Sequence, residues 1–205
     1  MIIILGTSHI APESIKKIKK AIKDEEPDCV AVELDPMRYE ALKSGETTNP
    51  PGFFLKFLSW LQKELGKMTG IFPGQEMLEA VEISKKNGIL VCLIDQDFYI
   101  TVNDINRIPL WEKVKLFTFT IFSGIGAKKI DLKKVPSEEI VNEAIKYLKD
   151  RFPFIYKILV LKRNRFMSKM IKELGQKHKK ILVVVGAGHV SGLKNLLKGE
   201  KIKII

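Results

Sequence analysis

Residues 2–9 read I-I-I-L-G-T-S-H, and residues 182–189 read L-V-V-V-G-A-G-H. Each stretch is an apolar run that breaks at a glycine and places a histidine three residues after it, as His9 and as His189. Continuous apolar runs of this kind are typical of strands that are covered on both faces of a parallel sheet. The similarity fades after residue 190, so we interpret it as a partial internal repeat. The two ends of the chain therefore predict two strands of one sheet.

Further apolar runs indicate the remaining strands. We expect buried strands at residues 28–34 and 89–94 and an edge strand at residues 201–205, while residues 101–172 have mostly helical spacing. The sequence thus predicts an α/β fold with a mixed, mostly parallel central sheet built from the N- and C-terminal parts, flanked by helices, with a helical insertion in the middle. We expect residues 1–205 to form a single domain, because this length suffices for one core.

The chain is strongly basic, with a formal net charge of +11 at pH 7. Between residues 146 and 180 the acids are Asp150 and Glu173 alone. A basic face of this kind attracts nucleic acid, anionic lipid headgroups or an acidic substrate, but a solvated helix surface has the same composition. We expect a peptide or small-molecule substrate as partner. A homo-oligomer and an anionic membrane surface are further candidates, whereas nucleic acid is not expected.

The cysteines and the apolar segments bear on location. Cys29 and Cys92 lie inside apolar runs and lack the spacing of a zinc site, so we expect reduced, buried thiols. No basic region precedes the first strand, so we expect no signal peptide. The apolar segments 53–61 and 116–127 are shorter than the roughly 20 residues that span a bilayer. These features predict a cytoplasmic protein, with peripheral membrane contact as the alternative.

Polar residues follow four of the expected strands. Because ligands bind at the carboxyl ends of strands in open α/β sheets, we expect these residues to meet in one crevice. They are Gly6-Thr7-Ser8-His9, Glu33-Leu34-Asp35, Asp95-Gln96-Asp97 and Gly186-Ala187-Gly188-His189.

The two histidines suggest a metal site. Two imidazoles and a carboxylate such as Glu33 suit a divalent first-row metal, which would activate a water molecule. Without a metal, the same groups could do acid–base work. The plainer alternative is that each histidine is a structural group. Likewise, Asp35 reads as a helix cap, and Glu76 as a surface acid at a helix start.

Six motifs, in the same order along the chain, resemble the TraB/PrgY family. The matching residues are Gly6-Thr7-Ser8-His9; Val32-Glu33-Leu34-Asp35 with Arg38; Gly74-Gln75-Glu76-Met77 with Ala80; Leu93-Ile94-Asp95-Gln96-Asp97 with Thr101; Arg163-Asn164 with Met167; and Val185-Gly186-Ala187-Gly188-His189 with Gly192. The family is similar to the Tiki membrane metalloproteases and, more loosely, to the haem-uptake ChaN and erythromycin-esterase proteins.

This resemblance implies peptide cleavage with manganese or cobalt, and we add zinc as a candidate cofactor. It nominates His9, Glu33 and His189 as catalytic metal ligands, with Arg163 and Asn164 as supporting catalytic groups. The remaining motif residues are expected to bind substrate: Gly6, Thr7, Ser8, Arg38, Glu76, Asp95, Gly186 and Gly188.

Two positions depart from the family pattern. Gln96 stands where many relatives have arginine, and Lys162 stands where they often have glutamate. We hypothesise that those two residues pair with each other in relatives, in which case both partners have changed here together.

The sequence therefore predicts a metal-dependent hydrolase that acts on peptides. The alternative is a non-catalytic regulatory or binding module of the same fold, which would contact a membrane or partner through its basic helical face. Aromatic residues in segments 53–60 and 117–122 suggest core packing, with a dimer interface or membrane contact as alternatives.

Overall fold

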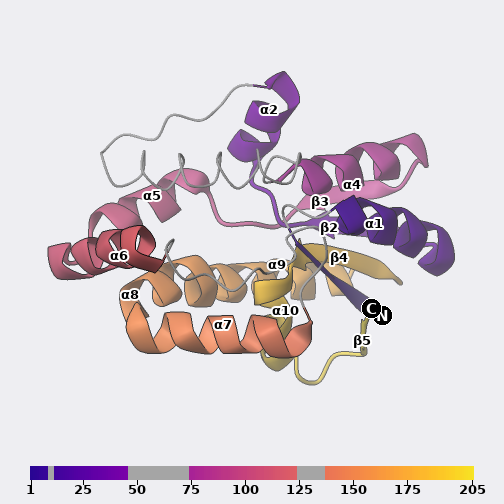
Figure 1. Cartoon of the computed structure of the whole chain (residues 1–205). Helices are drawn as coiled ribbons and strands as arrows, with labels where there is room; N and C mark the ends of the chain where they lie inside the picture. Colours follow the sequence, from indigo (N-terminus) through magenta and orange to yellow (C-terminus); the bar gives the residue numbers. More distant parts are fainter. Residues whose placement is uncertain (9–11, 46–73, 124–136) are drawn as a thin grey trace.

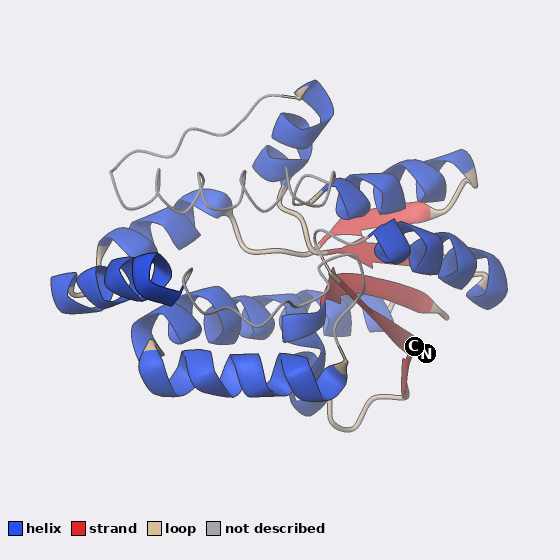
Figure 2. Ribbon diagram, in the orientation of Figure 1, coloured by secondary structure: helices blue, strands red, loops and turns tan. Residues whose placement is uncertain are grey.

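The computed structural model describes residues 1–8, 12–45, 74–123 and 137–205 (Figure 1), without side chains at 12 and 120–123. Helices and strands alternate in the first part of the chain, and a long run of helices precedes the last two strands (Figure 2). In chain order the elements are β1 (Ile2–Thr7), α1 (Pro12–Glu25), β2 (Cys29–Val32), α2 (Pro36–Ser44), α4 (Gln75–Lys86), β3 (Leu90–Leu93), α5 (Phe98–Asn106), α6 (Leu110–Ser123), α7 (Glu138–Arg151), α8 (Pro153–Tyr156), the π-helix η1 (Lys157–Lys162), α9 (Arg163–Gly175), β4 (Ile181–Gly186), α10 (Ala187–Leu196) and β5 (Ile202–Ile204).

The described strands form one five-stranded sheet in the order β3-β2-β4-β1-β5, and every neighbouring pair is parallel. The two repeated stretches occupy adjacent strands, with Ile2 opposite Ile181 and Thr7 opposite Gly186. This confirms the predicted α/β class and the assembly of the sheet from both ends of the chain.

Each face of the sheet is covered by its own set of helices. Strand residues such as Ile3 and Val184 pack with α1, α2 and α4 on one face, where Met77 is fully buried. On the other face, Ile4 and Val183 pack with α9 and α10. Adjacent residues of β1 and β4 thus enter opposite cores, which explains why both strands are apolar throughout.

A third core lies within the helices α5, α8 and η1. It contains Val102, Ile155 and Ile158. The buried carboxylate of Glu112 on α6 accepts hydrogen bonds from the backbone N–H of Phe154 at 3.4 Å and of Ile155 at 2.9 Å. This carboxylate fastens α6 to the start of α8. Figures 1 and 2 show these helices beyond the carboxyl ends of the strands.

Strand β3 differs from expectation in its burial. The run at residues 89–94 predicts a buried strand, but Leu90 is 51% exposed. The reason is its place at the edge of the sheet, next to β2 alone.

The cysteines are free, as expected, and their sulfur atoms lie 3.8 Å apart. Cys29 is buried as predicted, whereas Cys92 is only half-buried because it lies on the edge strand β3. Burial raises the pKa of Cys29 to about 12. Within the described ranges, no helix combines the length and the apolar character that crossing a membrane requires. The aromatic segment 53–60 lies outside the described residues.

Met167 is a direct test of the core between the sheet and α9. Its side chain is fully buried, so Met167→Ala should lower the free energy of unfolding by about 2–5 kcal/mol. Lys169→Ala on the exposed face of the same helix should change it by less than about 0.5 kcal/mol. Urea denaturation of both variants measures the difference, and equal stabilities would show that α9 does not pack as described.

Candidate functional site

The candidate site lies where β2 and β4 end side by side. Glu33 follows β2, and its backbone N–H donates to the Val184 carbonyl at 3.0 Å, which continues the ladder for one more residue. Gly186 ends β4, and His189 lies in the first turn of α10. The helices that follow these two strands cover opposite faces of the sheet. Ligand crevices in open α/β sheets form at such switch points.

Glu33 is held from three directions. Its Oε2 accepts a hydrogen bond from the backbone N–H of Gly186 at 2.6 Å. Its Oε1 accepts from Nη2 of Arg163 and faces Nε2 of His189 at 3.2 Å. The carboxylate is 2% exposed, so these contacts replace most of its hydration.

His189 lies between two oxygen atoms. Its Nδ1 is 2.6 Å from Oδ1 of Asn164, while Nε2 faces Glu33. Because an amide oxygen only accepts hydrogen bonds, Nδ1 carries the proton in this contact. In the neutral ring, the lone pair of Nε2 then points at the carboxylate, and a proton or a cation between them would satisfy both atoms.

Arg163 joins Glu33 to a second carboxylate. Its Nε donates to Oδ1 of Asp95 at 2.9 Å, and its Nη2 donates to Oδ2 at 2.7 Å. Such a fork between arginine and carboxylate is among the strongest protein hydrogen-bond pairs. Burial by itself would lower the pKa of Arg163, but Glu33 and Asp95 together raise it above its ordinary value. The guanidinium is therefore a permanent positive charge in the site.

A π-helix places Arg163 and Asn164 in the site. The irregular turn η1 ends at Lys162, directly before them. Such turns are frequent at functional positions because they alter which side chains face inward. Consecutive residues here serve different partners: Arg163 binds the two carboxylates, and Asn164 binds His189.

Arg38 is the most accessible cation of the site. It lies in the first turn of α2, and its Nη1 is 3.3 Å from Oδ2 of Asp95. Its side chain is 30% exposed, against 14% for Arg163. Gly74, the N-cap of α4, lies close to the same guanidinium.

Asp35 caps α2, as predicted. Its Oδ1 accepts from the backbone N–H of Met37 at 3.0 Å and of Arg38 at 3.2 Å. Its Oδ2 is buried and has no hydrogen-bond partner among the residues that the structure describes. Burial is the main cause of the raised pKa of Asp35, and Asp95 adds to it.

Two other predicted site residues, Glu76 and Asn164, are buried polar groups. Glu76 is fully buried in the first turn of α4, so its interpretation as a surface acid is wrong. Asn164 is buried as well, although its residue type alone favours an exposed position. In both cases one polar residue enters a helix face that packs inward.

The predicted residues of the first strand have other contacts. Thr7 donates through Oγ1 to the Val185 carbonyl at 3.3 Å. The backbone of Ser8 exchanges two hydrogen bonds of 3.0 Å with the hydroxyl of Ser14. His9 lies outside the described residues. The substrate-binding roles of these residues stay predictions.

Close packing explains three of the motif glycines. A Cβ on Gly192 would lie 2.1 Å from Nδ2 of Asn164, and one on Gly6 would lie 2.9 Å from Val190. On Gly188 it would lie 3.3 Å from Ile145. Gly192 thus leaves room for the side chain that orients His189. The sequence motif contains Gly192, but its role became visible only in the packing.

The two departures from the family pattern have different partners in this chain. Gln96 donates to the hydroxyl of Thr101 at 3.2 Å, and Lys162 pairs with Asp104 at 2.6 Å. Neither is left without a polar contact.

A cation site remains a prediction. Among the described residues, no group of three histidine, cysteine, aspartate or glutamate side chains is arranged to hold a metal ion. Glu33 and His189 do face each other, and the third predicted ligand, His9, is not described.

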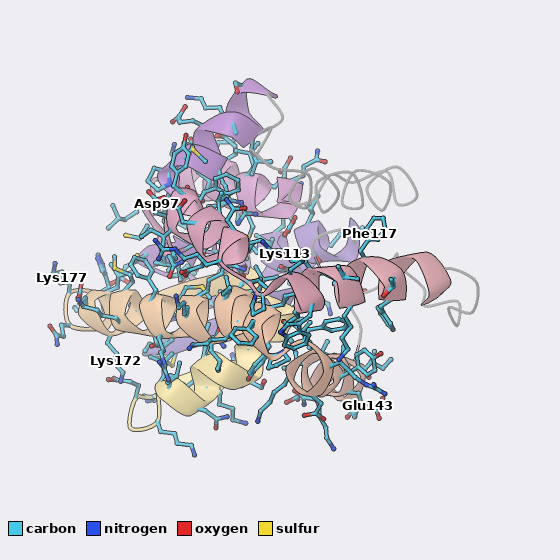
Figure 3. The ribbon with its side chains drawn as sticks, turned by 90° about the vertical axis from the view of Figure 1, so that its left-hand side faces the viewer. Asp97, Lys113, Phe117, Glu143, Lys172 and Lys177 are labelled. Atoms are coloured by element: carbon cyan, nitrogen blue, oxygen red, sulfur yellow. The ribbon has the colours of Figure 1, made fainter. Side chains whose placement is uncertain are left out.

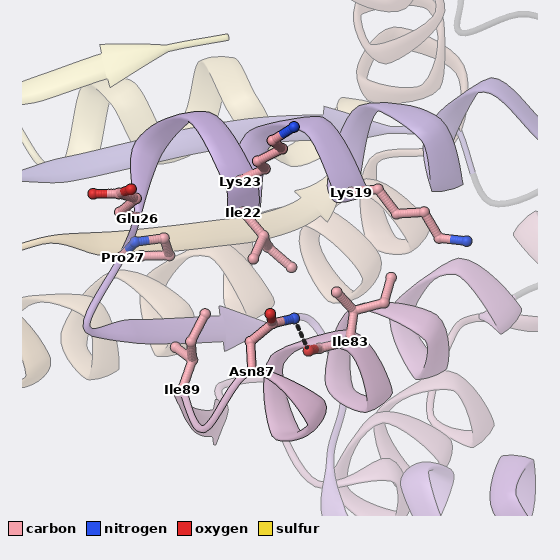
Figure 4. Close-up of a pocket in the computed structure, with 8 residues that line it drawn as sticks. All are labelled: Lys19, Ile22, Lys23, Glu26, Pro27, Ile83, Asn87 and Ile89. Carbon is pink, nitrogen blue, oxygen red and sulfur yellow. Dashed lines mark hydrogen bonds between the residues drawn. The ribbon is translucent and has the colours of Figure 1, made fainter.

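A surface hollow of about 480 Å³ lies elsewhere, between α1 and α4 (Figure 4). Two residues that line it, Pro27 and Ile89, lie within two residues of the starts of β2 and β3. The hollow is therefore at the amino edge of the sheet, opposite the candidate site.

The fold and the site define an α/β protein with a charged cluster at the carboxyl edge of a parallel sheet. The model of the TraB/PrgY/gumN family matches residues 1–204. The chain belongs to this family, which confirms the resemblance of its motifs.

Several known proteins are similar to the chain. An uncharacterized protein of Methanocaldococcus jannaschii is 36% identical over 96% of this chain and 53% of its own length. The TraB domain-containing protein of Bos taurus is 23% identical over 93% of this chain and 61% of its own length. The chain thus spans only about half to three-fifths of these relatives. A solved structure of Campylobacter jejuni ChaN with cofacially bound heme covers 99% of this chain and 79% of its own, with a TM-score of 0.48 and 11% identity.

Gly192→Ala tests the packing behind His189. The added methyl group meets Asn164, so the variant should lose about 1–3 kcal/mol of unfolding free energy. In an Asn164→Ala background the same change should cost less than about 0.5 kcal/mol, because the obstructing amide is gone. Gly175→Ala, where the nearest atom is 4.0 Å away, is the matched control. Additive costs in the double-mutant cycle would rule out this contact.

Asp35→Asn separates the two roles of Asp35, because asparagine caps a helix but cannot ionise. With a raised pKa, protonated Asp35 contributes stability below its unfolded pKa of about 3.9, and this is lost as pH rises through the folded pKa. Asp35→Asn should therefore match the wild type at low pH and exceed its stability as pH rises. Asp35→Ala should stay about 1 kcal/mol below Asp35→Asn. Urea denaturation across pH measures both, and parallel curves for wild type and Asp35→Asn would contradict the assignment.

Proposed function

We propose that this chain is a metal-dependent hydrolase that cleaves peptides at the carboxyl edge of β2 and β4. The observation that carries the proposal is the pair formed by Glu33 Oε1 and His189 Nε2, which are 3.2 Å apart. With the ring proton on Nδ1, both atoms are acceptors. Two ligand atoms that each lie about 2.0–2.2 Å from one shared cation are separated from each other by a similar distance. The donor set therefore fits a divalent ion.

The chemistry of the two ligands limits which metal ions are candidates. Imidazole and carboxylate together suit manganese, cobalt or zinc. Such an ion, when bound, would lower the pKa of a water molecule and supply hydroxide near neutral pH.

The topology supports His9 as the further ligand. Strand β1 lies beside β4, with Thr7 opposite Gly186, and parallel neighbours are about 4.8 Å apart. His9 is two residues past Thr7, and His189 is three residues past Gly186. In the sequence, each histidine thus follows a strand whose carboxyl end is at this edge, and this supports the proposal.

The surrounding residues fix these ligands. The Gly186 N–H and Arg163 hold the two oxygens of Glu33, and Asn164 holds the ring of His189. Partners of this kind orient metal ligands and raise their basicity. The Nη1 of Arg163 donates to the Leu159 carbonyl at 3.4 Å. This nitrogen is the group proposed to turn toward a substrate carbonyl oxygen.

Arg38 is proposed to bind the peptide itself. Its half-buried guanidinium lies 3.3 Å from Oδ2 of Asp95. A planar arginine fork suits a carboxylate or a main-chain carbonyl of a substrate.

The test compares the histidines of the chain. His189→Ala and Glu33→Gln should each reduce bound manganese, cobalt or zinc, measured by elemental analysis after loading and dialysis, by at least about tenfold. Hydrolysis of a fluorogenic peptide library should fall by at least about a hundredfold. His178→Ala, which alters a histidine in the loop after α9, is the control and should change neither quantity.

The alternative, a binding module without turnover, is favoured by one observation. Arg163 already forms ion pairs with both Glu33 and Asp95, so part of their negative charge is balanced without a metal ion. If wild type and His189→Ala retain no metal and release no product, while both remain folded, the hydrolase proposal fails and the binding module stands. His9→Ala gives a second, independent variant for the same comparison.

A further inference from the structure

An apolar stripe lies exposed on the helices beyond the sheet. We name it the α6–α8 surface. Its members are large side chains that are 41–75% exposed: Leu110, Trp111, Val114, Phe119, Tyr147 and Phe154. Exposed apolar side chains that occur singly need no explanation, but a contiguous group marks an interaction site.

Ring contacts make this group continuous. The Trp111 ring meets the Phe154 ring edge to face, with centroids 6.3 Å apart. Further along α6, Phe119 packs against Tyr147 at 5.6 Å. Phe119 also meets the Phe152 ring at 5.8 Å. The ammonium of Lys115 is 5.4 Å from this Phe152 ring and donates to the Arg151 carbonyl at 2.9 Å. The surface thus combines aromatic rings with a cation.

The α6 part of the stripe carries positive charge. Figure 3 shows Lys113 and Phe117 on α6, whereas Glu143 lies on the side of α7 away from α6. The acid in α6, Glu112, is buried and caps α8, so Lys113 and Lys115 are the charged side chains of α6 that remain. On α7 the charges are mixed, because Asp150 precedes Arg151.

We propose that the α6–α8 surface docks on an anionic lipid bilayer. Tryptophan and aliphatic side chains such as Trp111 and Leu110 are suited to the membrane interface, which lies between the apolar lipid tails and the hydrated headgroups. Lysine and arginine beside them attract anionic phospholipid. Together they have the composition of helices that lie on a membrane without crossing it.

Charge argues against the other occupants. A symmetric dimer would place α6 against its own copy, so Lys113 would meet its own copy without an exposed acid on α6 to pair with, because Glu112 is buried. A nucleic acid could use the cations and the aromatic rings, but it would leave the exposed aliphatic side chains of Leu110 and Val114 in water. The bilayer is the partner that uses both the apolar and the basic residues. This docking does not depend on hydrolase activity.

Vesicle binding tests the docking with the whole chain. A Trp60→Phe background leaves Trp111 as the sole tryptophan, since the chain has two. Vesicles of phosphatidylcholine and phosphatidylglycerol should shift its fluorescence to the blue and protect it from iodide, whereas pure phosphatidylcholine should bind at least about tenfold more weakly. In the Trp-containing wild type, sedimentation with the same vesicles gives the affinity.

Variants separate this surface from the general positive charge. Leu110→Ser with Trp111→Ser should weaken sedimentation by at least about tenfold. Both positions are exposed, so the fold should be retained. Lys172→Glu with Lys177→Glu, at the far end of α9 and its following loop (Figure 3), should weaken it far less. As a second variant, Val114→Asp should act like the double serine change.

Three results would overturn the docking. One is the absence of binding to either vesicle. Another is an equal loss in the Lys172 and Lys177 control, which would assign binding to diffuse charge. The third concerns a dimer seen in sedimentation equilibrium. If Leu110→Ser with Trp111→Ser converts this dimer to monomer but leaves vesicle binding unchanged, the docking proposal fails. The surface would then be assigned to contact with a second copy of the chain.

Discussion

The carboxyl edge of the sheet depends on the guanidinium of Arg163, which binds carboxylates that follow two different strands. Glu33 and Asp95 are both almost completely buried, and without a cation between them their charges would repel and would lack hydration. Removing one partner of a buried ion pair typically costs about 3–5 kcal/mol. Arg163 therefore fixes the ends of β2 and β3 relative to the start of α9. Arg38, which is more exposed than Arg163, forms a second ion pair with Asp95 and so balances more of the negative charge of the site.

The close packing of Asn164 against the backbone of Gly192 also constrains His189. Asn164 reaches the imidazole only because position 192 has no side chain. The orientation of the ring is thus set jointly by a buried amide on α9 and by a glycine one turn further along α10. These motif residues of the family form one packed unit here, in which His189, its orienting group and the space for that group come from two helices.

The strands and the main site residues could be predicted from the sequence for a physical reason. Apolar runs that end in polar residues have a local signature, so Glu33, Asp95 and His189 could be assigned to strand ends before their positions were known. The bonds of Arg163 could not, because its partners are 130 and 68 residues away in the chain. Neither could the burial of Glu76, since a single acid in a helix gives no indication of what covers it. His9 and the metal itself stay predictions.

The position of β1 bears on how the chain is made. Its neighbours in the sheet are β4 and β5, which begin at Ile181 and Ile202. During synthesis the first strand therefore emerges long before any strand that can pair with it, and it must remain unpaired or be protected while some 170 residues follow. Sheets that close such long loops fold slowly and expose strand edges to aggregation. For this chain, β2 and β3 can pair early, but β1 can join the sheet, and Glu33 can meet Gly186 and His189, only after β4 has been synthesised.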